Sequence, residues 1–241
     1  MHLKKLTLRP QDYPVKDIYP FNLDVFKMSP ALEFDTKITF FCGENGSGKS
    51  TLLKAVTKRC GIYIWKEYGK TRFDYNPYED ELYRYIDIEW ADGKKPGAYF
   101  SAESYEHLAT IIDDWASCDP DLLDYFGGKS LITQSHGESF MSFFKSRYRI
   151  EGVYFLDEPE TALSPKRQIE FLRLLTLMSA DGHAQFVIAT HSPILLSCPG
   201  AKIISFDGEK LEPIHYEETD YYRIYRDFLL DREKYLKDLD G

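Results

Sequence analysis

A glycine-rich segment between residues 43 and 50 has the residue types needed to bind a phosphate group. Its sequence, GENGSGKS, fits the pattern G-x-x-x-x-G-K-[ST]. Glycines let successive backbone N–H groups turn toward one anion, and a following helix adds its dipole. Lys49 would contact the outer phosphates of a nucleotide, and the Ser50 hydroxyl would ligate Mg²⁺. The predicted nucleotide-binding residues are Gly43, Glu44, Asn45, Gly46, Ser47, Gly48, Lys49, Ser50 and Thr51.

Two acidic residues end an apolar run further along the chain. In VYFLDEPE the run closes with Asp157, and Glu158 comes directly after it. A buried strand would bring the Asp157 carboxylate to the edge of a sheet, where it would hold Mg²⁺ directly or through water. Since alternate strand residues face opposite ways, we expect Glu158 to point elsewhere, as the general base for an attacking water. A solvated acidic turn is the alternative interpretation.

A histidine follows the next apolar run. In AQFVIATHSP, His191 comes at the end of the apolar run, after Thr190. Open parallel sheets bind ligands at the carboxyl ends of their strands, so we expect His191 and Asp157 near one crevice. A neutral imidazole there would hold the outermost phosphate and the attacking water in line. A lone histidine after a strand is often structural, but its place after the loop and the acid pair favours function.

The elements that must position these residues can be predicted from apolar periodicity. Ile38 to Cys42 is apolar throughout and precedes the loop, and a helical pattern starts at Thr51. Upstream, residues 1 to about 42 alternate around four prolines and predict short antiparallel strands. Residues 62 to 100 combine tyrosine-rich runs with turn signals.

The second half of the chain alternates between helical and strand patterns. Residues 104 to 125 are expected to be helical, with Leu108, Ile111, Ile112 and Trp115 on one face. A further helix is expected near Glu138, and SPKRQIEFLRLLTLMSADG predicts an amphipathic helix with Pro at its first position. AKIISFDG predicts another buried strand, and the charged tail is expected to be helical.

The order of these elements predicts an α/β fold. We expect a P-loop NTPase with a mostly parallel central sheet flanked by helices, an N-terminal antiparallel β lobe and a small helical lobe. The chain is expected to be one domain, residues 1–241. Within it, about 1–100 would form the β-rich nucleotide lobe, about 101–150 the helical lobe, and about 151–241 the acidic strand, the histidine and the tail.

Composition limits the possible function classes. The 241 residues are 43% hydrophobic and 29% charged, as in ordinary globular proteins. No apolar run approaches a membrane span, no secretory leader is apparent, and the four cysteines are scattered, so we expect a cytoplasmic protein. A net charge of −9 does not indicate a surface that grips nucleic acid unaided, although a local basic groove remains open.

Taken in order, GENGSGKS, QSHGES, FLDEPE, TALSP and ATHSP resemble the ABC-type ATPase family. The form resembles small standalone ATPases and SMC-like heads rather than transporter subunits. The resemblance implies ATP and Mg²⁺ as ligands, Ser50 and Asp157 as magnesium residues, and Lys49, Glu158 and His191 as catalytic residues.

The resemblance also implies a homodimer. The family has a serine-glycine-glycine-glutamine signature before the acidic strand, and Ser135, His136, Gly137 and Glu138 stand in that place. Ser135 and Gly137 match, whereas His136 and Glu138 depart from the pattern. The segment would cap the outermost phosphate of ATP bound to a second subunit, because a helix N-terminus with a hydroxyl suits an anion.

Other family positions match less directly. Ser164 replaces the usual aspartate of the dimer-facing loop, and the glutamine loop would correspond to residues 99–104, with Glu103 or Ser104 in its place. The candidates by distance for an aromatic that stacks on adenine are Tyr13, Tyr19 and Phe21.

Three functions remain open from the sequence. The first is an ATPase whose closure regulates a partner or a nucleic-acid process, without the long coiled coil of SMC-like proteins, since about 85 residues separate Ser50 from Ser135. The second is the ATP-binding subunit of a transporter. The third is a slow-turnover module that restrains an effector. The tail from Tyr216 onward would dock a protein partner, or would pack as a solvated helix on its own domain.

Overall fold

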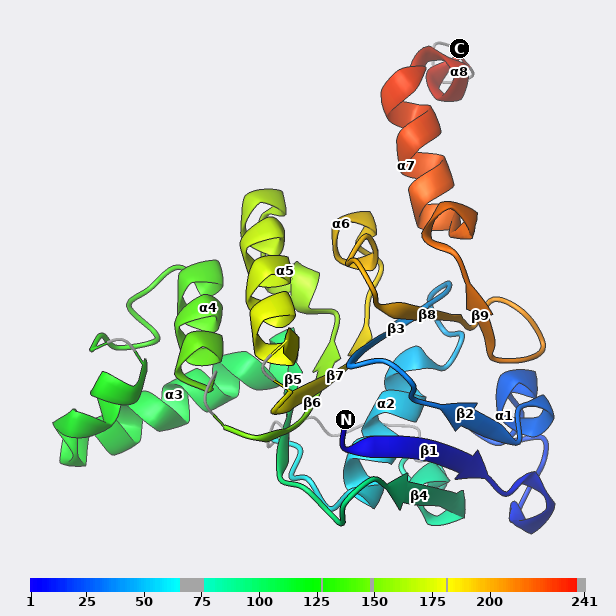
Figure 1. Ribbon diagram of the computed structural model, residues 1–241, viewed down its shortest axis with the longest axis horizontal. Helices are drawn as coiled ribbons and strands as arrows, with labels where there is room; N and C mark the ends of the chain where they lie inside the picture. Colours follow the sequence, from blue (N-terminus) through cyan, green and yellow to red (C-terminus); the bar gives the residue numbers. More distant parts are fainter. Residues whose placement is uncertain (66–75, 127, 148–149, 181, 238–241) are drawn as a thin grey trace.

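The computed structural model describes residues 1–65, 76–126, 128–147, 150–180 and 182–237 (Figure 1). Its larger sheet has the strand order β5-β6-β7-β3-β8-β9, in which β9 alone pairs antiparallel. A smaller antiparallel sheet has the order β2-β1-β4. The strands are β1 (Leu3–Leu8), β2 (Ala31–Glu33), β3 (Ile38–Cys42), β4 (Ile86–Trp90), β5 (Gly97–Ser101), β6 (Gly152–Asp157), β7 (Ala184–Ala189), β8 (Lys202–Ser205) and β9 (Glu212–Ile214).

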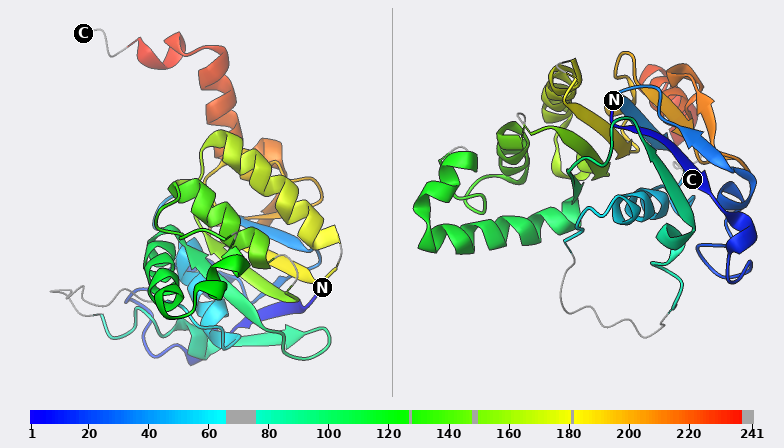
Figure 2. Two further views of the ribbon diagram at one scale, coloured as in Figure 1. Left: turned by 90° about the vertical axis from the view of Figure 1, so that its left-hand side faces the viewer. Right: turned by 60° about the horizontal axis from the view of Figure 1, so that its bottom comes forward.

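Helices cover both faces of the larger sheet, and the predicted α/β fold class is confirmed. Helix α2 lies between the two sheets, and α7 projects away from the body in both figures (Figures 1 and 2). The helices are α1 (Asp24–Met28), α2 (Lys49–Arg59), α3 (Ala102–Cys118), α4 (His136–Arg147), α5 (Pro165–Ala180), α6 (Pro193–Leu196), α7 (Asp220–Leu230) and α8 (Glu233–Leu236).

The side chains of each central strand contribute to two hydrophobic cores, one on each face of the sheet, because successive side chains point to opposite faces. On β6, Val153 and Phe155 pack with α2 and the small sheet, whereas Tyr154 and Leu156 pack with α3, α4 and α5. All four are buried. A parallel sheet covered on both faces requires such continuous apolar runs, which is why these strands were predictable from sequence.

Two glycines permit the close pairing of β5 with β6. A Cβ on Gly97 would lie 2.2 Å from the Val153 carbonyl oxygen, and one on Gly152 would lie 2.5 Å from the Pro96 carbonyl oxygen. No larger residue fits at either position without moving backbone. The pairing aligns Ser101 with Asp157, so β5 ends beside the acidic end of β6.

A buried glutamine joins the start of the chain to the larger sheet. Gln185 on β7 accepts hydrogen bonds from the backbone N–H groups of His2 and Leu3, at 2.8 and 2.7 Å, and donates one to the Leu3 carbonyl at 3.0 Å. Its side chain is fully buried. These bonds fix β1, and with it the small sheet, against the strand that precedes His191.

The prediction for the face of the helix after Ser104 is wrong in one residue. Leu108 and Ile112 are buried, but Trp115 is 55% exposed and packs edge-on against Trp65. The far end of α3 extends past the edge of the larger sheet (Figure 1). The α-helix ends at Cys118, and a 3₁₀ helix, Pro120–Phe126, covers the rest of the predicted helical range. Part of the tyrosine-rich pattern, residues 66–75, lies outside the described residues.

Candidate nucleotide-binding and catalytic site

The glycine loop joins β3 to α2 with three glycines at positive φ. Gly43, Gly46 and Gly48 have φ of 142°, 81° and 103°, values that other residues rarely adopt. At Gly48 space is lacking as well, because a Cβ there would lie 2.8 Å from the Phe26 ring. The loop therefore turns tightly into the N-terminus of α2, which begins at Lys49. The loop begins at the carboxyl end of β3, as the strand–loop–helix pattern predicts.

The Lys49 side chain is buried and folded over this loop. Its Nζ donates to the carbonyl oxygens of Gly43, at 2.6 Å, and Glu44, at 2.8 Å. Burial lowers the pKa of Lys49, while the carboxylates of Glu158, Asp207 and Asp157 act in the opposite direction. An ammonium group held this way is available to a phosphate in the loop. Among the described residues, the nearby buried hydroxyl of Ser47 has no hydrogen-bond partner, as expected of a group that faces an anion.

Asp157, Ser50 and Tyr99 form a compact group of oxygen donors. The Ser50 hydroxyl donates to Asp157 Oδ1 at 2.7 Å, and the Tyr99 hydroxyl donates to Oδ2 at 2.9 Å. Burial raises the pKa of Asp157, against the effect of these hydrogen bonds. A buried carboxylate beside a hydroxyl suits Mg²⁺, which prefers oxygen ligands and completes its shell with phosphates and water. The residues present fit that ion.

Glu158 is turned by its backbone rather than by strand alternation. Strand β6 ends at Asp157, and Glu158 has φ 48° and ψ 54°, in the left-handed region. It has the one positive φ of a non-glycine residue in the described part of the chain. Such a conformation costs about 1–3 kcal/mol and is frequent at functional sites. Its N–H donates to the Ala189 carbonyl at 2.9 Å, which holds the turn beside β7.

His191 lies against Glu158 and is held from three sides. Its Nε2 is 3.3 Å from Glu158 Oε1, and its Nδ1 shares a hydrogen bond with the Tyr221 hydroxyl. Its backbone N–H donates to Glu160 Oε1 at 2.6 Å. Burial and Lys49 lower the pKa of His191, although the Glu158 carboxylate opposes them. The ring therefore tends to be neutral at physiological pH.

The signature segment stands apart from this group, at the start of α4. Gly137 lies close to the 3₁₀ turn that follows Glu158, since a Cβ there would be 3.1 Å from the Ala162 carbonyl oxygen. The Ser135 hydroxyl donates to Glu138 Oε2 at 2.8 Å, and Glu138 also pairs with Arg167 at 3.3 Å. The Ser135 hydrogen bond lowers the pKa of Glu138, which stays ionised. The side chain of His136 lies outside the described residues.

The structure thus gathers Lys49, Ser50, Asp157, Glu158 and His191 at the carboxyl edge of the larger sheet. Ser135 and Glu138 are brought beside Arg167 instead. Thr51 hydrogen-bonds to the Tyr19 hydroxyl. Asn45 and Gly46 are exposed on the loop.

Among the aromatic candidates, two cannot reach a nucleotide base. Tyr13 and Phe21 are buried in the core that surrounds α2. Tyr19 is partly exposed beside the first turn of α2 and remains a candidate. Glu103 and Ser104, proposed for the glutamine loop, have side chains outside the described residues, but Tyr99 from the same segment contacts Asp157.

Three more side chains at the site were missed from the sequence. Glu160 accepts from the His191 backbone, Asp207 accepts from the Glu44 N–H at 2.6 Å, and the Tyr221 hydroxyl donates to the Gly43 carbonyl at 2.8 Å. Asp207 comes shortly after β8, and Asp157 is the last residue of β6, so the end of a predicted strand was a usable signal. Tyr221 lies in a tyrosine-rich tail and carries no such signal.

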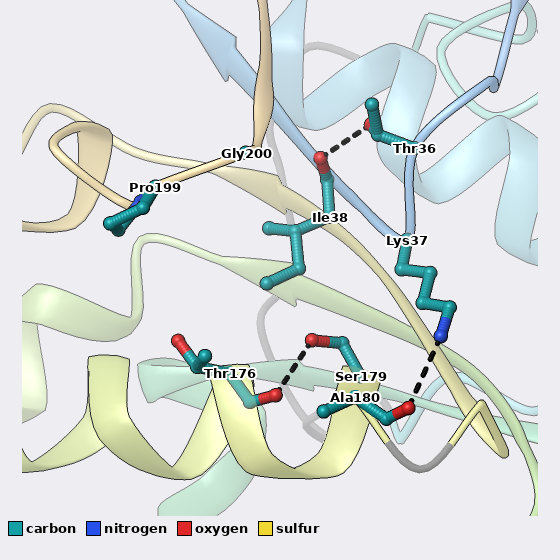
Figure 3. A pocket seen from close by; sticks show the side chains of 8 residues that line it. All are labelled: Thr36, Lys37, Ile38, Thr176, Ser179, Ala180, Pro199 and Gly200. Carbon is teal, nitrogen blue, oxygen red and sulfur yellow. Dashed lines mark hydrogen bonds between the residues drawn. The ribbon is translucent and has the colours of Figure 1, made fainter.

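Two hollows lie on the described surface, one away from the site and one beside it. One of about 270 Å³ lies at the opposite end of β3, between Lys37 and the end of α5 (Figure 3). It is far from the strand ends that carry the acids, and its Lys37 ammonium is used by the Ala180 carbonyl. The other, of about 790 Å³, runs from His191 between α5, α6 and α7 and is mainly apolar.

Family models match both halves of the site. One described as "AAA domain, putative AbiEii toxin, Type IV TA system" matches residues 107–197, and one described as "AAA domain" matches residues 23–60. The first range contains Ser135, Asp157, Glu158 and His191, and the second contains the phosphate-binding loop. Both matches are to AAA-type domains and support a P-loop ATPase of the AAA/ABC type. A comparison with curated proteins gives no match.

Solved structures resemble this chain at low sequence identity. A structure described as an inward-facing conformation of a "putative metal-chelate type ABC transporter" is 15% identical, covers 93% of this chain and 88% of its own, and has a TM-score of 0.53. The SMC head domain from Thermotoga maritima is 17% identical over 89% of this chain and 100% of its own, with a TM-score of 0.49. CbiO1 from Clostridium perfringens, described as part of the ABC transporter complex CbiONQ, is 17% identical over 97% and 98%, with a TM-score of 0.47.

In the described part of the chain, no helix combines the length and the apolar character needed to cross a bilayer.

Proposed function

We propose that this ATPase binds ATP with Mg²⁺ and hydrolyses it between two copies of the chain, and that closure of the dimer regulates a partner or a nucleic-acid process. The observation that carries the proposal is the convergence of five side chains from separate elements. Lys49 and Ser50 come from α2, Asp157 and Glu158 from the end of β6, and His191 from the end of β7, where Glu158 and His191 lie 3.3 Å apart.

Each residue then has a chemical role. Residues 43–51 hold the phosphates through backbone N–H groups, with the Lys49 charge on the outer two. Ser50 and Asp157 would hold Mg²⁺, which when bound would neutralise negative charge on the phosphates. Glu158 accepts a proton from the attacking water, and His191 fixes that water in line with the bond that breaks. Phosphoryl transfer depends mainly on such positioning.

The dimer follows from the place of the signature segment. Ser135 and Gly137 lie at the N-terminus of a 12-residue helix, on the surface, where they would contact ATP bound to the second copy. Glu138 adds negative charge there, but Arg167 pairs with it. An approaching phosphate would compete with Glu138 for the Ser135 hydroxyl, so closure requires that Glu138 turn away.

The proposed effect of ATP binding and hydrolysis is a change in the fraction of the protein that forms the closed dimer. Contacts to the last phosphate exist only before hydrolysis, so ATP favours the closed state and ADP does not. The projecting helix α7 is our candidate for docking a protein partner, because Ile224, Leu229 and Leu230 are 53%, 78% and 80% exposed. We place the protein in the cytoplasm. DNA would be contacted through a partner, given the net charge of −9.

Light scattering of Glu158→Gln with and without Mg-ATP tests the proposal. The amide cannot take a proton from water, so this variant should bind ATP, release no phosphate and roughly double its mass. The wild type should release phosphate. Lys49→Ala should neither release phosphate nor increase its mass with ATP. If the mass of Glu158→Gln is the same with and without ATP, the ATP-dependent dimer is contradicted. If Lys49→Ala still hydrolyses ATP, the assignment of the phosphate-binding loop is contradicted.

A slow-turnover module that restrains an effector is a second candidate. The ionised Glu138 at the start of α4 favours it, because a carboxylate there opposes an incoming phosphate. Glu138→Gln should then accelerate phosphate release at least tenfold. A transporter subunit has no feature of the described chain in its favour beyond the shared fold.

A further inference from the structure

Arg167 lies beside the signature segment, in the first turn of α5. Its Nη2 is 3.3 Å from Glu138 Oε1, and its Nη1 is 3.0 Å from Glu170 Oε2. The aliphatic stem lies against the start of α4, because a Cβ on Gly137 would be 3.7 Å from Arg167 Cγ. The side chain is 32% exposed, so an approaching molecule can reach it.

Arg167 belongs to the same surface as the groups that we place against the ATP of the second copy. The Ser135 hydroxyl donates to Glu138 Oε2 at 2.8 Å, and the other oxygen of that carboxylate accepts from Arg167. Gly137 lies against the Ala162 carbonyl, in the turn that leads from β6 to α5. A phosphate that approaches the Ser135 hydroxyl therefore approaches Arg167 as well.

Closure on a nucleotide would change the partners of this arginine. Glu138 must turn away to release the Ser135 hydroxyl, and it can do so at small cost, because exposed ion pairs contribute little stability. Arg167 then loses one of its two carboxylate partners. Glu170, one turn further along α5, still holds Nη1 and keeps the side chain against α4.

The guanidinium has donors for a phosphate in this state. It has five N–H groups, and the bonds to Glu138 and Glu170 use one on each terminal nitrogen. Hydrogen bonds between a guanidinium and a phosphate are charge-assisted and often bidentate. Arg167 approaches from α5, beside the N-terminus of α4, so it leaves the Ser135 hydroxyl and the N–H groups of α4 free to contact the same phosphate.

We propose that Arg167 is a catalytic residue supplied by the opposite copy: when two chains close, its guanidinium leaves Glu138 and hydrogen-bonds to the outermost phosphate of the ATP held by the other chain. This rests on the proposed hydrolysis between two copies. Negative charge shifts among the phosphate oxygens as the bond to the leaving ADP breaks, and a guanidinium at this position stabilises it. The cation also offsets the repulsion between Glu138 and the incoming phosphate.

Phosphate release by charge-removing variants tests this role. Arg167→Gln should lower kcat at least about tenfold, because the reacting phosphate loses a cation. Arg173→Gln changes an exposed arginine on the same helix and should stay within about twofold of wild type. If Arg167 served only to neutralise Glu138, the double variant Glu138→Gln/Arg167→Gln would regain the wild-type rate. That recovery, or full turnover in Arg167→Gln alone, overturns the proposal.

Mixing two impaired variants tests whether the arginine comes from the opposite copy. In a mixed dimer of Arg167→Gln and Glu158→Gln, one site combines the general base of the first chain with the arginine of the second. The equimolar mixture should release phosphate about fivefold or more above the mean of the two separate samples. A rate equal to that mean would show that Arg167 does not act across the interface, and would overturn the proposal.

Light scattering separates this inference from the proposed function. In the Glu158→Gln background, Arg167→Gln should raise the Mg-ATP concentration for half-maximal dimer formation about tenfold. Arg167→Met keeps an unbranched stem against α4 and replaces the glutamine variant if that one does not fold. If Glu158→Gln shows no ATP-dependent mass and wild type releases no phosphate, the proposed function fails and this inference with it. If both are seen and Arg167→Gln alters neither, the role of Arg167 alone fails.

Discussion

At the scale of single residues, Glu160 holds a carboxylate where the protein interior disfavours charge. Its Oε1 accepts from the His191 N–H at 2.6 Å, but its buried Oε2 has no partner among the described residues. Burial raises the pKa of Glu160. A carboxylate that must ionise in such a place costs stability, and it does so to keep the His191 backbone in position.

Glu160→Gln should therefore stabilise the protein as pH rises. With a folded-state pKa above the ordinary value of about 4.3, the contribution of Glu160 is fully present below that pH and is lost as pH rises through the raised pKa. The amide keeps the acceptor for His191 and does not ionise. In urea unfolding we expect similar midpoints near pH 4 and a gain of about 1 kcal/mol by pH 8.

The matched variant is Glu160→Ala, which removes the acceptor as well and should lose stability at both pH values. A Glu160→Gln advantage that stays constant with pH would show that ionisation of Glu160 is not the cause.

Sequence patterns predicted the site residues whose position is set by neighbours in the sequence. Lys49 and Ser50 follow the glycines that shape their loop, and Asp157 ends its own apolar strand, so pattern and position coincide. Tyr99, Asp207 and Tyr221 act through contacts with residues far away in the chain, such as Tyr221 with Gly43. A contact across such a distance leaves no periodicity, and only the folded backbone reveals it.

At the scale of elements, apolar runs predicted the parallel strands well because each strand is buried on both faces. The β3 prediction, Ile38 to Cys42, coincides with the strand. Helix faces were less predictable, as Trp115 demonstrates, because exposure depends on what lies opposite. Strand alternation was the wrong basis for the orientation of Glu158, since this residue lies beyond the strand and its backbone is left-handed.

The tie made by Gln185 predicts a measurable loss of stability. Gln185→Leu leaves the N–H groups of His2 and Leu3 and the Leu3 carbonyl buried without their partner, which should cost about 2–4 kcal/mol in urea unfolding. Gln11→Leu changes an exposed glutamine and should be nearly neutral. Equal midpoints for the two variants would mean that β1 is held by its other contacts.

The glycines between β5 and β6 give a second prediction for an element. In Gly97→Ala the new methyl meets the Val153 carbonyl at 2.2 Å and Ile62 at 2.5 Å, so β5 must shift. We expect a loss of about 1–3 kcal/mol of stability and, because Tyr99 moves away from Asp157, a higher Mg²⁺ concentration for half-maximal turnover. Gly208→Ala has 3.7 Å of space and is the control. If the Mg²⁺ dependence of turnover is unchanged in Gly97→Ala, Tyr99 has no influence on the proposed metal site.

At the scale of the whole molecule, dimer closure is the proposal that most needs a separate test. Ser135→Arg, made in the Glu158→Gln background, places a long cation at the start of α4 and should abolish the ATP-dependent mass increase. ATP binding by the single chain should remain within about threefold, because Ser135 is not part of its own phosphate loop. Ser117→Arg, on exposed α3, should still dimerise. Equal masses for both would remove the role of the signature segment across the interface.

The strand order has a consequence for how the chain is made. The loop that would hold ATP leaves the ribosome early, yet its strand β3 lies between β7 and β8, which come from the last quarter of the chain. At 5–20 residues per second, on the order of ten seconds of synthesis separates β3 from both neighbours. Throughout that interval the apolar run before the loop has no sheet to join. The nascent chain is thus exposed to chaperones and aggregation until its final strands arrive, and the proposed nucleotide site can form only then.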